Sequence, residues 1–155
     1  MPRGLEESRV YHREEFMYID ERIKSLVGVP FVDGGRDENG YDCWGLVREI
    51  YRRYNIVLPD YKIACYDVLN VTQEMENNRK NWIKCSIEDA PVPCIAAFRV
   101  SASMVNHVGI YIGNGKFIHT REKSGAVIEN LDSPIWRHRL EGLYAYKFSD
   151  TKKSV

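Results

Sequence analysis

Residues 41–55 read YDCWGLVREIYRRYN and place a cysteine where a turn-rich loop becomes a helix. From Asp42 to about Tyr54 the apolar residues recur at helical spacing, and Asp42 is well placed as the N-cap. Cys43 then lies in the first turn, on the apolar stripe. It is either a small buried core residue or a nucleophile whose thiolate the helix start stabilises. The rest of the chain has to decide between these interpretations.

Length and charge limit the class of protein. The length of 155 residues predicts one domain over residues 1–155. The 22 basic and 22 acidic side chains balance, so the chain has no excess positive charge that would attract nucleic acid. No apolar run approaches the ~20 residues of a transmembrane helix, so no membrane insertion is expected. The N-terminus lacks the pattern of a secretory signal, which predicts synthesis in the cytoplasm without a signal peptide.

The cysteine spacing argues against a structural metal or a disulfide framework. No two of the four cysteines form a CxxC pair, and the chain is too large to need covalent staples. We therefore expect no metal and no cofactor. The four are Cys43, Cys65, Cys85 and Cys94.

Helical patterns come first along the chain and strand patterns follow. Residues 12–27 predict a helix that Gly28 and Pro30 end, residues 28–40 read as a loop, and residues 66–82 predict a further, weaker helix. Short apolar or alternating runs follow the breaker EDAPVPC. These runs are 95–100, the hairpin 107–120, 125–131 and 140–148. This order predicts an α+β fold, with N-terminal helices packed on a C-terminal antiparallel meander.

The hairpin HVGIYIGNGKFIHT, residues 107–120, carries one histidine on each strand. With a two-residue loop at 114–115, His119 points away from His107. With a three-residue loop at 113–115, His119 faces Gly109, and the two imidazoles are diagonal neighbours on one face. The longer loop also gathers the apolar residues of the first strand on the opposite face, so we predict it. The other histidines, His12 and His138, sit among charges and are expected at the surface.

A cysteine at a helix start and two histidines on one sheet face suit nucleophilic catalysis. His107 would be the general base towards Cys43 and the general acid towards a leaving amine. His119 would accept a hydrogen bond from the other nitrogen of His107 and fix its tautomer. The N–H groups of the first helical turn are candidate oxyanion donors.

YDCWGLV, followed by HVGIYIGNGKFIHT, resembles the NlpC family of cell-wall cysteine peptidases, over roughly residues 12–148. The resemblance implies a papain-like fold with the triad Cys43, His107 and His119. It implies that Tyr41 lies on the oxyanion and substrate side, and Asp42 and Trp44, the direct neighbours of Cys43, complete the candidate substrate and oxyanion set. It also implies hydrolysis of peptidoglycan stem peptides between γ-linked D-glutamate and a diamino acid.

Two departures from the family pattern concern the flanks of the site. Trp44 stands where the family commonly has serine, which resembles the branch found in phage tails and prophages. PVPCIAAF replaces the usual Pro-Gly-Asp before the first strand. Together with the missing signal peptide, the resemblance suggests a tail-associated protein that acts on the cell wall, with phage tail proteins as partners. Two alternatives stay open: a non-catalytic tail assembly protein on the same fold, and a thioester-forming acyltransferase.

Overall fold

The computed structural model describes residues 19–60, 73, 77, 81–99 and 107–147. Two helices, α2 (Glu21–Lys24) and α3 (Cys43–Arg53), precede most of the sheet. A small hairpin of β1 (Arg36–Asp37) and β2 (Gly40–Tyr41) lies between them. The remaining strands are β3 (Trp82–Cys85), β4 (Cys94–Phe98), β5 (His107–Gly113), β6 (Lys116–Arg121), β7 (Gly125–Asn130) and β8 (Leu140–Tyr146). This arrangement confirms the predicted α+β class.

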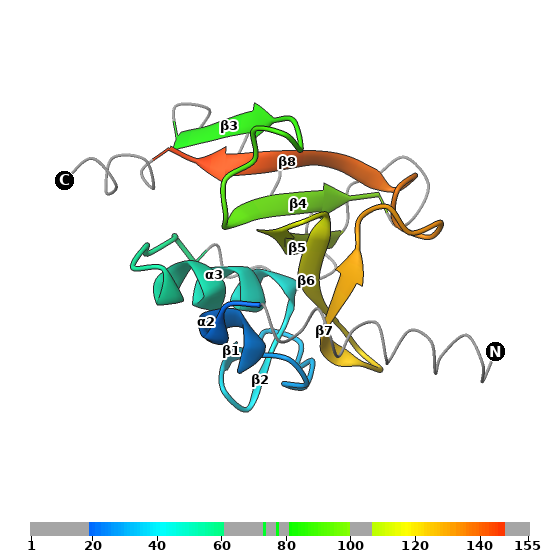
Figure 1. Ribbon diagram of the computed structural model, residues 1–155. Coiled ribbons are helices and arrows are strands. Elements are labelled where there is room, and N and C mark those ends of the chain that lie inside the picture. The colour runs from blue at the N-terminus through cyan, green and yellow to red at the C-terminus, as the bar shows by residue number, and fades with distance from the viewer. Residues whose placement is uncertain (1–18, 61–72, 74–76, 78–80, 100–106, 148–155) are drawn as a thin grey trace.

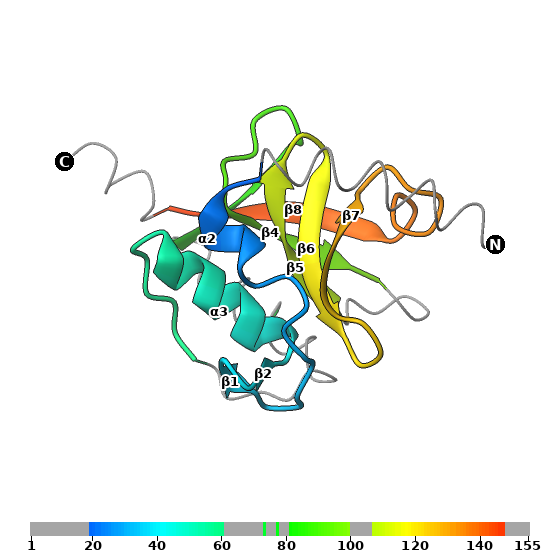
Figure 2. The same ribbon diagram turned by 60° about the horizontal axis from the view of Figure 1, so that its bottom comes forward.

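The six later strands form one antiparallel sheet in the order β3-β8-β4-β5-β6-β7. The helix α3 packs on one side of this sheet, against β5 and β6, and α2 lies beside α3 (Figures 1 and 2). The helix that begins at Cys43 therefore lies against the two strands that carry His107 and His119.

Each face of the sheet covers its own core. On the α3 side, Val108, Ile110 and Ile118 pack in one cluster with the apolar stripe of the helix. On the other side, aromatic rings of Phe98, Phe117 and Trp136 form a second cluster. Because side chains alternate along a strand, a residue next to Val108 faces the ring cluster instead.

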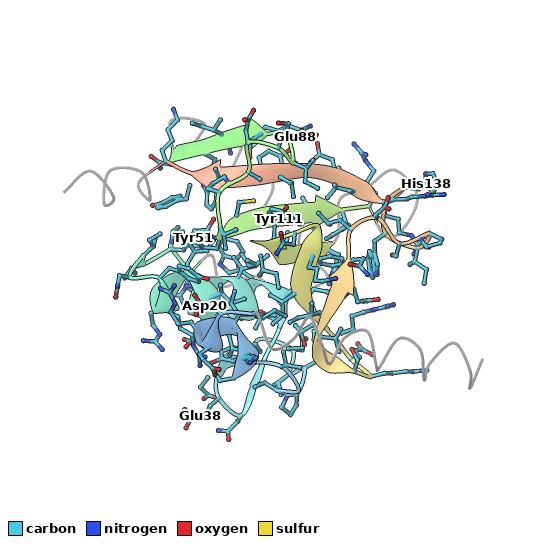
Figure 3. The ribbon with its side chains drawn as sticks, viewed as in Figure 1. Asp20, Glu38, Tyr51, Glu88, Tyr111 and His138 are labelled. Carbon is cyan, nitrogen blue, oxygen red and sulfur yellow. The ribbon has the colours of Figure 1, made fainter. Side chains whose placement is uncertain are left out.

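The last turn of α3 is held by a buried tyrosine. Tyr51 lies between α3 and the far strands (Figure 3), and its ring meets those of Trp82 and Tyr146 edge-on, with centroids 6.3 and 6.2 Å away. Its hydroxyl donates a hydrogen bond to the carbonyl oxygen of Pro93 at 3.4 Å. These contacts fix the direction of α3 on the sheet.

The hairpin has the predicted register but a different turn. Ile110 pairs with Ile118 and Tyr111 with Phe117. In this register Gly109 lies opposite His119, as the longer loop requires. The turn is nevertheless a tight one at Asn114 and Gly115, both with positive φ, of 53° and 74°. A bulge between Tyr111 and Gly113 absorbs the extra residue. The prediction of a three-residue loop was therefore wrong, because Gly113 pairs with Lys116. The predicted position of Gly109 opposite His119 is present.

The position of Gly109 opposite His119 is closely packed. A Cβ at Gly109 would lie 2.8 Å from the Ile118 carbonyl oxygen and 3.0 Å from the His119 Cβ. A side chain at residue 109 would therefore press on the β6 backbone and on the Cβ of His119.

Several sequence predictions need correction. In the described part of 12–27, the helix covers only Glu21–Lys24, because Asp20 caps it and a turn follows Lys24. Residues 28–40 contain β1 and part of β2, which were predicted as loop. β3 was not predicted, and its first residue, Trp82, was assigned to a helix. Most of the weaker helix at 66–82 lies outside the described residues. In the described ranges, no helix has the length and hydropathy needed to cross a membrane.

Candidate active site

The start of α3 is fixed by Asp42. Its carboxylate accepts the N–H of Gly45 at 2.8 Å, which confirms the predicted N-cap, and it accepts the N–H of Gly34 at 3.1 Å. The first intrahelical bond runs from Leu46 N to Asp42 O. Asp42 thus ties the preceding loop to the first helical turn and sets the position of Cys43.

An arginine balances the buried charge of Asp42. Asp42 is fully buried, and Nη1 of Arg36 donates to its Oδ1 at 2.6 Å. Nε of Arg36 also lies 3.2 Å from Oδ1 of Asp60, and Arg48 reaches the same carboxylate at 3.4 Å. A buried carboxylate is tolerated when it is paired and hydrogen-bonded in this way. In this structure Asp42 orders the helix start, and its place in the substrate set stays a prediction.

The indole of Trp44 is part of the core. Only 1% of Trp44 is exposed, and its indole N–H donates to the carbonyl oxygen of Pro59 at 3.2 Å. The side chain therefore fastens the segment after α3 to the first helical turn. Its backbone N–H group, together with that of Cys43, stays a candidate oxyanion donor because the first N–H groups of a helix point out along its axis.

Tyr41 ends β2 directly before the cap. It is 5% exposed, and burial raises the pKa of its phenol. The phenol therefore stays protonated and can donate a hydrogen bond at neutral pH. Its function on the oxyanion side stays a prediction.

The structure brings the two hairpin histidines together. Nε2 of His107 lies 2.8 Å from Nδ1 of His119, which is hydrogen-bonding distance. His119 is fully buried and His107 is partly exposed. The bond uses only Nε2 of His107, so Nδ1 is the ring nitrogen available to a second partner.

Aromatic rings enclose this pair. The Trp136 ring stacks on His107, with centroids 5.9 Å apart and 29° between the planes, and meets His119 edge-on at 4.9 Å. Phe98 and Phe117 lie against the two imidazoles at 5.9 and 4.6 Å. Burial is the main cause that lowers the pKa of His107 to about 3. The resting imidazole is therefore neutral at neutral pH.

One polar residue of the site was missed in the sequence. Oε2 of Glu129 on β7 lies 2.6 Å from Nε2 of His119. Burial alone would raise the pKa of Glu129, but its hydrogen bond and charge interaction with His119, with smaller contributions from Trp136 and Arg121, lower it below the ordinary value. The alternation along 125–131 could have placed Glu129 on the same face as His119, but it could not show that the two side chains meet.

Cys43 lies at the edge of the core shared with the histidine strands. It is 2% exposed and belongs to the same core cluster as Val108, the residue next to His107. Cys43 packs in the cluster on the α3 face of the sheet, whereas the His107 ring lies among the aromatic rings of the other cluster, so these contacts do not test the predicted pairing of the Cys43 sulfur with His107. The pairing itself, and the catalytic assignment of the three residues, stay predictions.

Comparison with known proteins identifies the family. Residues 28–144 match the NlpC/P60 family, and the chain therefore belongs to it. The chain is 30% identical over 113 residues to the murein DD-endopeptidase MepS/murein LD-carboxypeptidase of Escherichia coli K12, a match that covers 72% of this chain and 53% of that protein. It is 31% identical over 116 residues to the bifunctional muramidase/DL-endopeptidase CwlT of Bacillus subtilis, covering 73% and 31%. The chain thus spans about half the length, or less, of these two relatives.

Solved structures share the fold. An NlpC/P60 family protein from Bacillus cereus aligns with a TM-score of 0.61 and 24% identity, covering 79% of this chain and 37% of that one. A protein of the same family from Staphylococcus aureus aligns with a TM-score of 0.59 and 23% identity, covering 81% and 39%. These likenesses confirm the predicted NlpC-type fold.

Proposed function

We propose that this chain is a cysteine peptidase that hydrolyses peptide bonds of peptidoglycan, with Cys43 as the nucleophile. The observation that carries the proposal is the His107–His119 hydrogen bond of 2.8 Å on the strands against which the Cys43 helix packs. A neutral imidazole held by one nitrogen and available at the other is what a general base requires.

The proposed reaction begins at the sulfur. Nδ1 of His107 takes the thiol proton as Sγ of Cys43 bonds to the scissile carbonyl carbon, and the carbonyl π electrons move to the oxygen. N–H groups at the start of α3 would stabilise that oxyanion. The tetrahedral intermediate then collapses, the C–N bond breaks, and His107 gives the proton to the departing amine.

A second half-reaction releases the acyl group. Water attacks the thioester carbon while His107 takes one of its protons, and the C–S bond breaks when this second intermediate collapses. The sulfur recovers its proton from His107. The products are a carboxylate and an ammonium group, since the proton of the new carboxylic acid passes to the released amine, and the protein returns to its starting state.

The relatives support peptidoglycan as the substrate class. The names of the two curated relatives describe a murein DD-endopeptidase and a DL-endopeptidase, so these proteins differ in the bond that they cut. For this chain we propose the bond between γ-linked D-glutamate and a diamino acid, on the strength of its sequence motifs. We also propose, from the resemblance of the residues around Trp44, that a phage or prophage tail carries the domain to the cell wall.

The test is digestion of purified peptidoglycan. The protein should release soluble fragments whose masses and new amino termini identify the cut bond, and Cys43→Ala should release none while unfolding at the same temperature. Equal release by Cys43→Ala would contradict the mechanism. No release by either protein, with unchanged binding to the polymer, would favour the tail scaffold. Products joined to an added amine in place of water would favour the acyltransferase.

A further inference from the structure

Glu129 continues the line of hydrogen bonds that begins at His107. His119 on β6 pairs with Val127 of β7, and Phe117 pairs with Glu129, so the His119 and Glu129 side chains are diagonal neighbours on one face. Oε2 of Glu129 lies 2.6 Å from Nε2 of His119, while Nδ1 of His119 lies 2.8 Å from Nε2 of His107. Three side chains from three consecutive strands are thus connected in series.

The carboxylate gives this series a direction. An ionised carboxylate only accepts hydrogen bonds, so Nε2 of a neutral His119 must carry the proton and Nδ1 must hold the lone pair. His119 can then bond to His107 only by accepting its Nε2–H. The lone pair of His107 is consequently on Nδ1, where a thiol proton can be taken.

The opposite pair of tautomers would form the same hydrogen bond between the two histidines. If Nδ1 of His119 carried the proton, it would donate to Nε2 of His107, and Nδ1–H of His107 could not act as a base. Nothing in the His107–His119 bond itself selects between the two. Glu129 makes the difference, because the second arrangement sets a lone pair against its carboxylate.

The surroundings of Glu129 keep it ionised at low cost. Its side chain is 33% exposed, so the charge is not fully desolvated, whereas His119 is 0% exposed. When His107 gains a proton, the negative charge of Glu129, two hydrogen bonds away, stabilises the His107 imidazolium. No carboxylate has to contact the His107 ring directly.

We propose that Glu129 is a positioning residue of the active site, which sets the tautomers of His119 and, through it, of His107. This inference rests on the proposed function for its catalytic consequence, but the tautomer itself can be measured without a substrate. Glu129 acts through His119, as outer-shell carboxylates act on other histidines.

Two substitutions distinguish the hydrogen-bond acceptor of Glu129 from its negative charge. Glu129→Leu removes the acceptor at similar size, and Glu129→Gln keeps a carbonyl oxygen that can accept Nε2–H of His119. Glu88→Gln, at an exposed site far from β7 (Figure 3), is the matched control for loss of one carboxylate. Thermal unfolding of all three would show that they fold.

The first measurement is nitrogen-15 NMR of the histidine rings in the free protein. In the unmodified chain, His119 should show a protonated Nε2 and a pyridine-type Nδ1, and Glu129→Gln should keep this pattern. Glu129→Leu should show the reversed or a mixed pattern. An unchanged His119 tautomer in Glu129→Leu would overturn the proposal, whether or not the protein cuts peptidoglycan.

The second measurement is the rate of stem-peptide cleavage. Glu129→Leu should lower kcat by about 10–100-fold, the range for loss of an outer-shell partner, with little change in KM, and Glu129→Gln should recover most of it. Equal kcat for Glu129→Leu and Glu88→Gln would contradict the proposal. If the unmodified protein cuts no stem peptide, the proposed function is wrong. The effect of Glu129 on the His119 tautomer is then tested by the NMR measurement alone.

Discussion

Nε2 of His107 and Nδ1 of His119 lie 2.8 Å apart, across a hairpin whose register places Gly109 opposite His119. A Cβ at residue 109 would lie 3.0 Å from the Cβ of His119 and 2.8 Å from the carbonyl oxygen of Ile118, so a side chain there would displace His119. The His107 ring is thereby held through one nitrogen, with the other available. The same residues that form the hairpin therefore also form the base of the proposed site.

Removal of the His119 imidazole should lower activity and spare the fold. We expect His119→Ala to lower kcat/KM for stem-peptide cleavage by about 10²–10⁴-fold, because the His107 tautomer is no longer fixed. His119→Gln, whose amide oxygen can accept a hydrogen bond, should recover part of the loss. His138→Ala, at an exposed histidine (Figure 3), is the control. Activity of His119→Ala equal to that control would contradict the assignment.

The pKa of His107 makes stability sensitive to acid. Burial lowers it to about 3 in the folded state, against 6.5 for the ordinary group. As pH falls below about 6.5, the unfolded chain binds a proton at this residue and the folded chain does not, so stability is lost. The loss has an upper limit of about 1.4 kcal/mol per pH unit, and partial exposure of the ring reduces it.

Urea unfolding at about pH 7 and pH 5 measures this effect. The free energy of unfolding of the unmodified protein should fall more between these values than that of His107→Gln. Identical pH dependence of the two proteins would show that His107 protonates normally in the folded state.

The Trp44 side chain should be important for stability and not needed for the cleavage reaction. Trp44→Phe keeps a buried ring but loses the bond to Pro59, which should lower the free energy of unfolding by about 1 kcal/mol and leave kcat nearly unchanged. Trp44→Ala should lower it by about 3–5 kcal/mol through the cavity left in the core. A folded Trp44→Phe protein with a large loss of kcat would instead indicate that the indole takes part in the reaction.

Gly45 should not tolerate a side chain. A Cβ there would collide with the carbonyl oxygen of Gly35 and would lie 3.2 Å from both Arg36 Nη1 and Asp42 Oδ1, so the cap would have to move. We expect Gly45→Ala to lower the free energy of unfolding by about 1–3 kcal/mol and to reduce cleavage.

The control for Gly45→Ala is Arg52→Ala on the exposed side of α3. It should change stability by no more than about 0.5 kcal/mol, since exposed ion pairs contribute little. Thermal unfolding measures the loss of stability of both variants. A similar loss for both would show that the loop around Gly45 can move to accommodate a side chain.

Local patterns predicted those parts of the site that depend on neighbours in sequence. The period of α3 and the identity of Asp42 place Cys43 in the first turn, and the alternation of the hairpin places His107 and His119 on one face. The turn at Asn114 differs from the prediction because a bulge can supply the extra residue within the strand. Sequence spacing does not distinguish a bulge from a longer loop.

Contacts between distant segments were not predictable in the same way. The partner of Trp44 is the carbonyl of Pro59, whose position depends on the path of the chain after α3. Glu129 meets His119 only because β7 pairs with β6 in one register. The strand β3 was missed because it is four residues long and pairs, among the described strands, only with β8.

The thiols differ in environment, and this difference gives the most direct test. Burial raises the pKa values of Cys85 and Cys94. Cys43 lies at a helix start, where the partial positive charge favours the thiolate, and the proposed pairing with His107 would favour it further. Its alkylation should therefore be the fastest among these three thiols, and should depend on His107.

The measurement that tests the central claim is iodoacetamide alkylation near pH 6, with each cysteine followed by peptide mass. Cys43 should react at least about tenfold faster than the other cysteines. His107→Gln should remove this advantage, and Arg52→Ala should preserve it. Equal rates for all cysteines, or an equal Cys43 rate in His107→Gln, would contradict the pairing of Cys43 with His107.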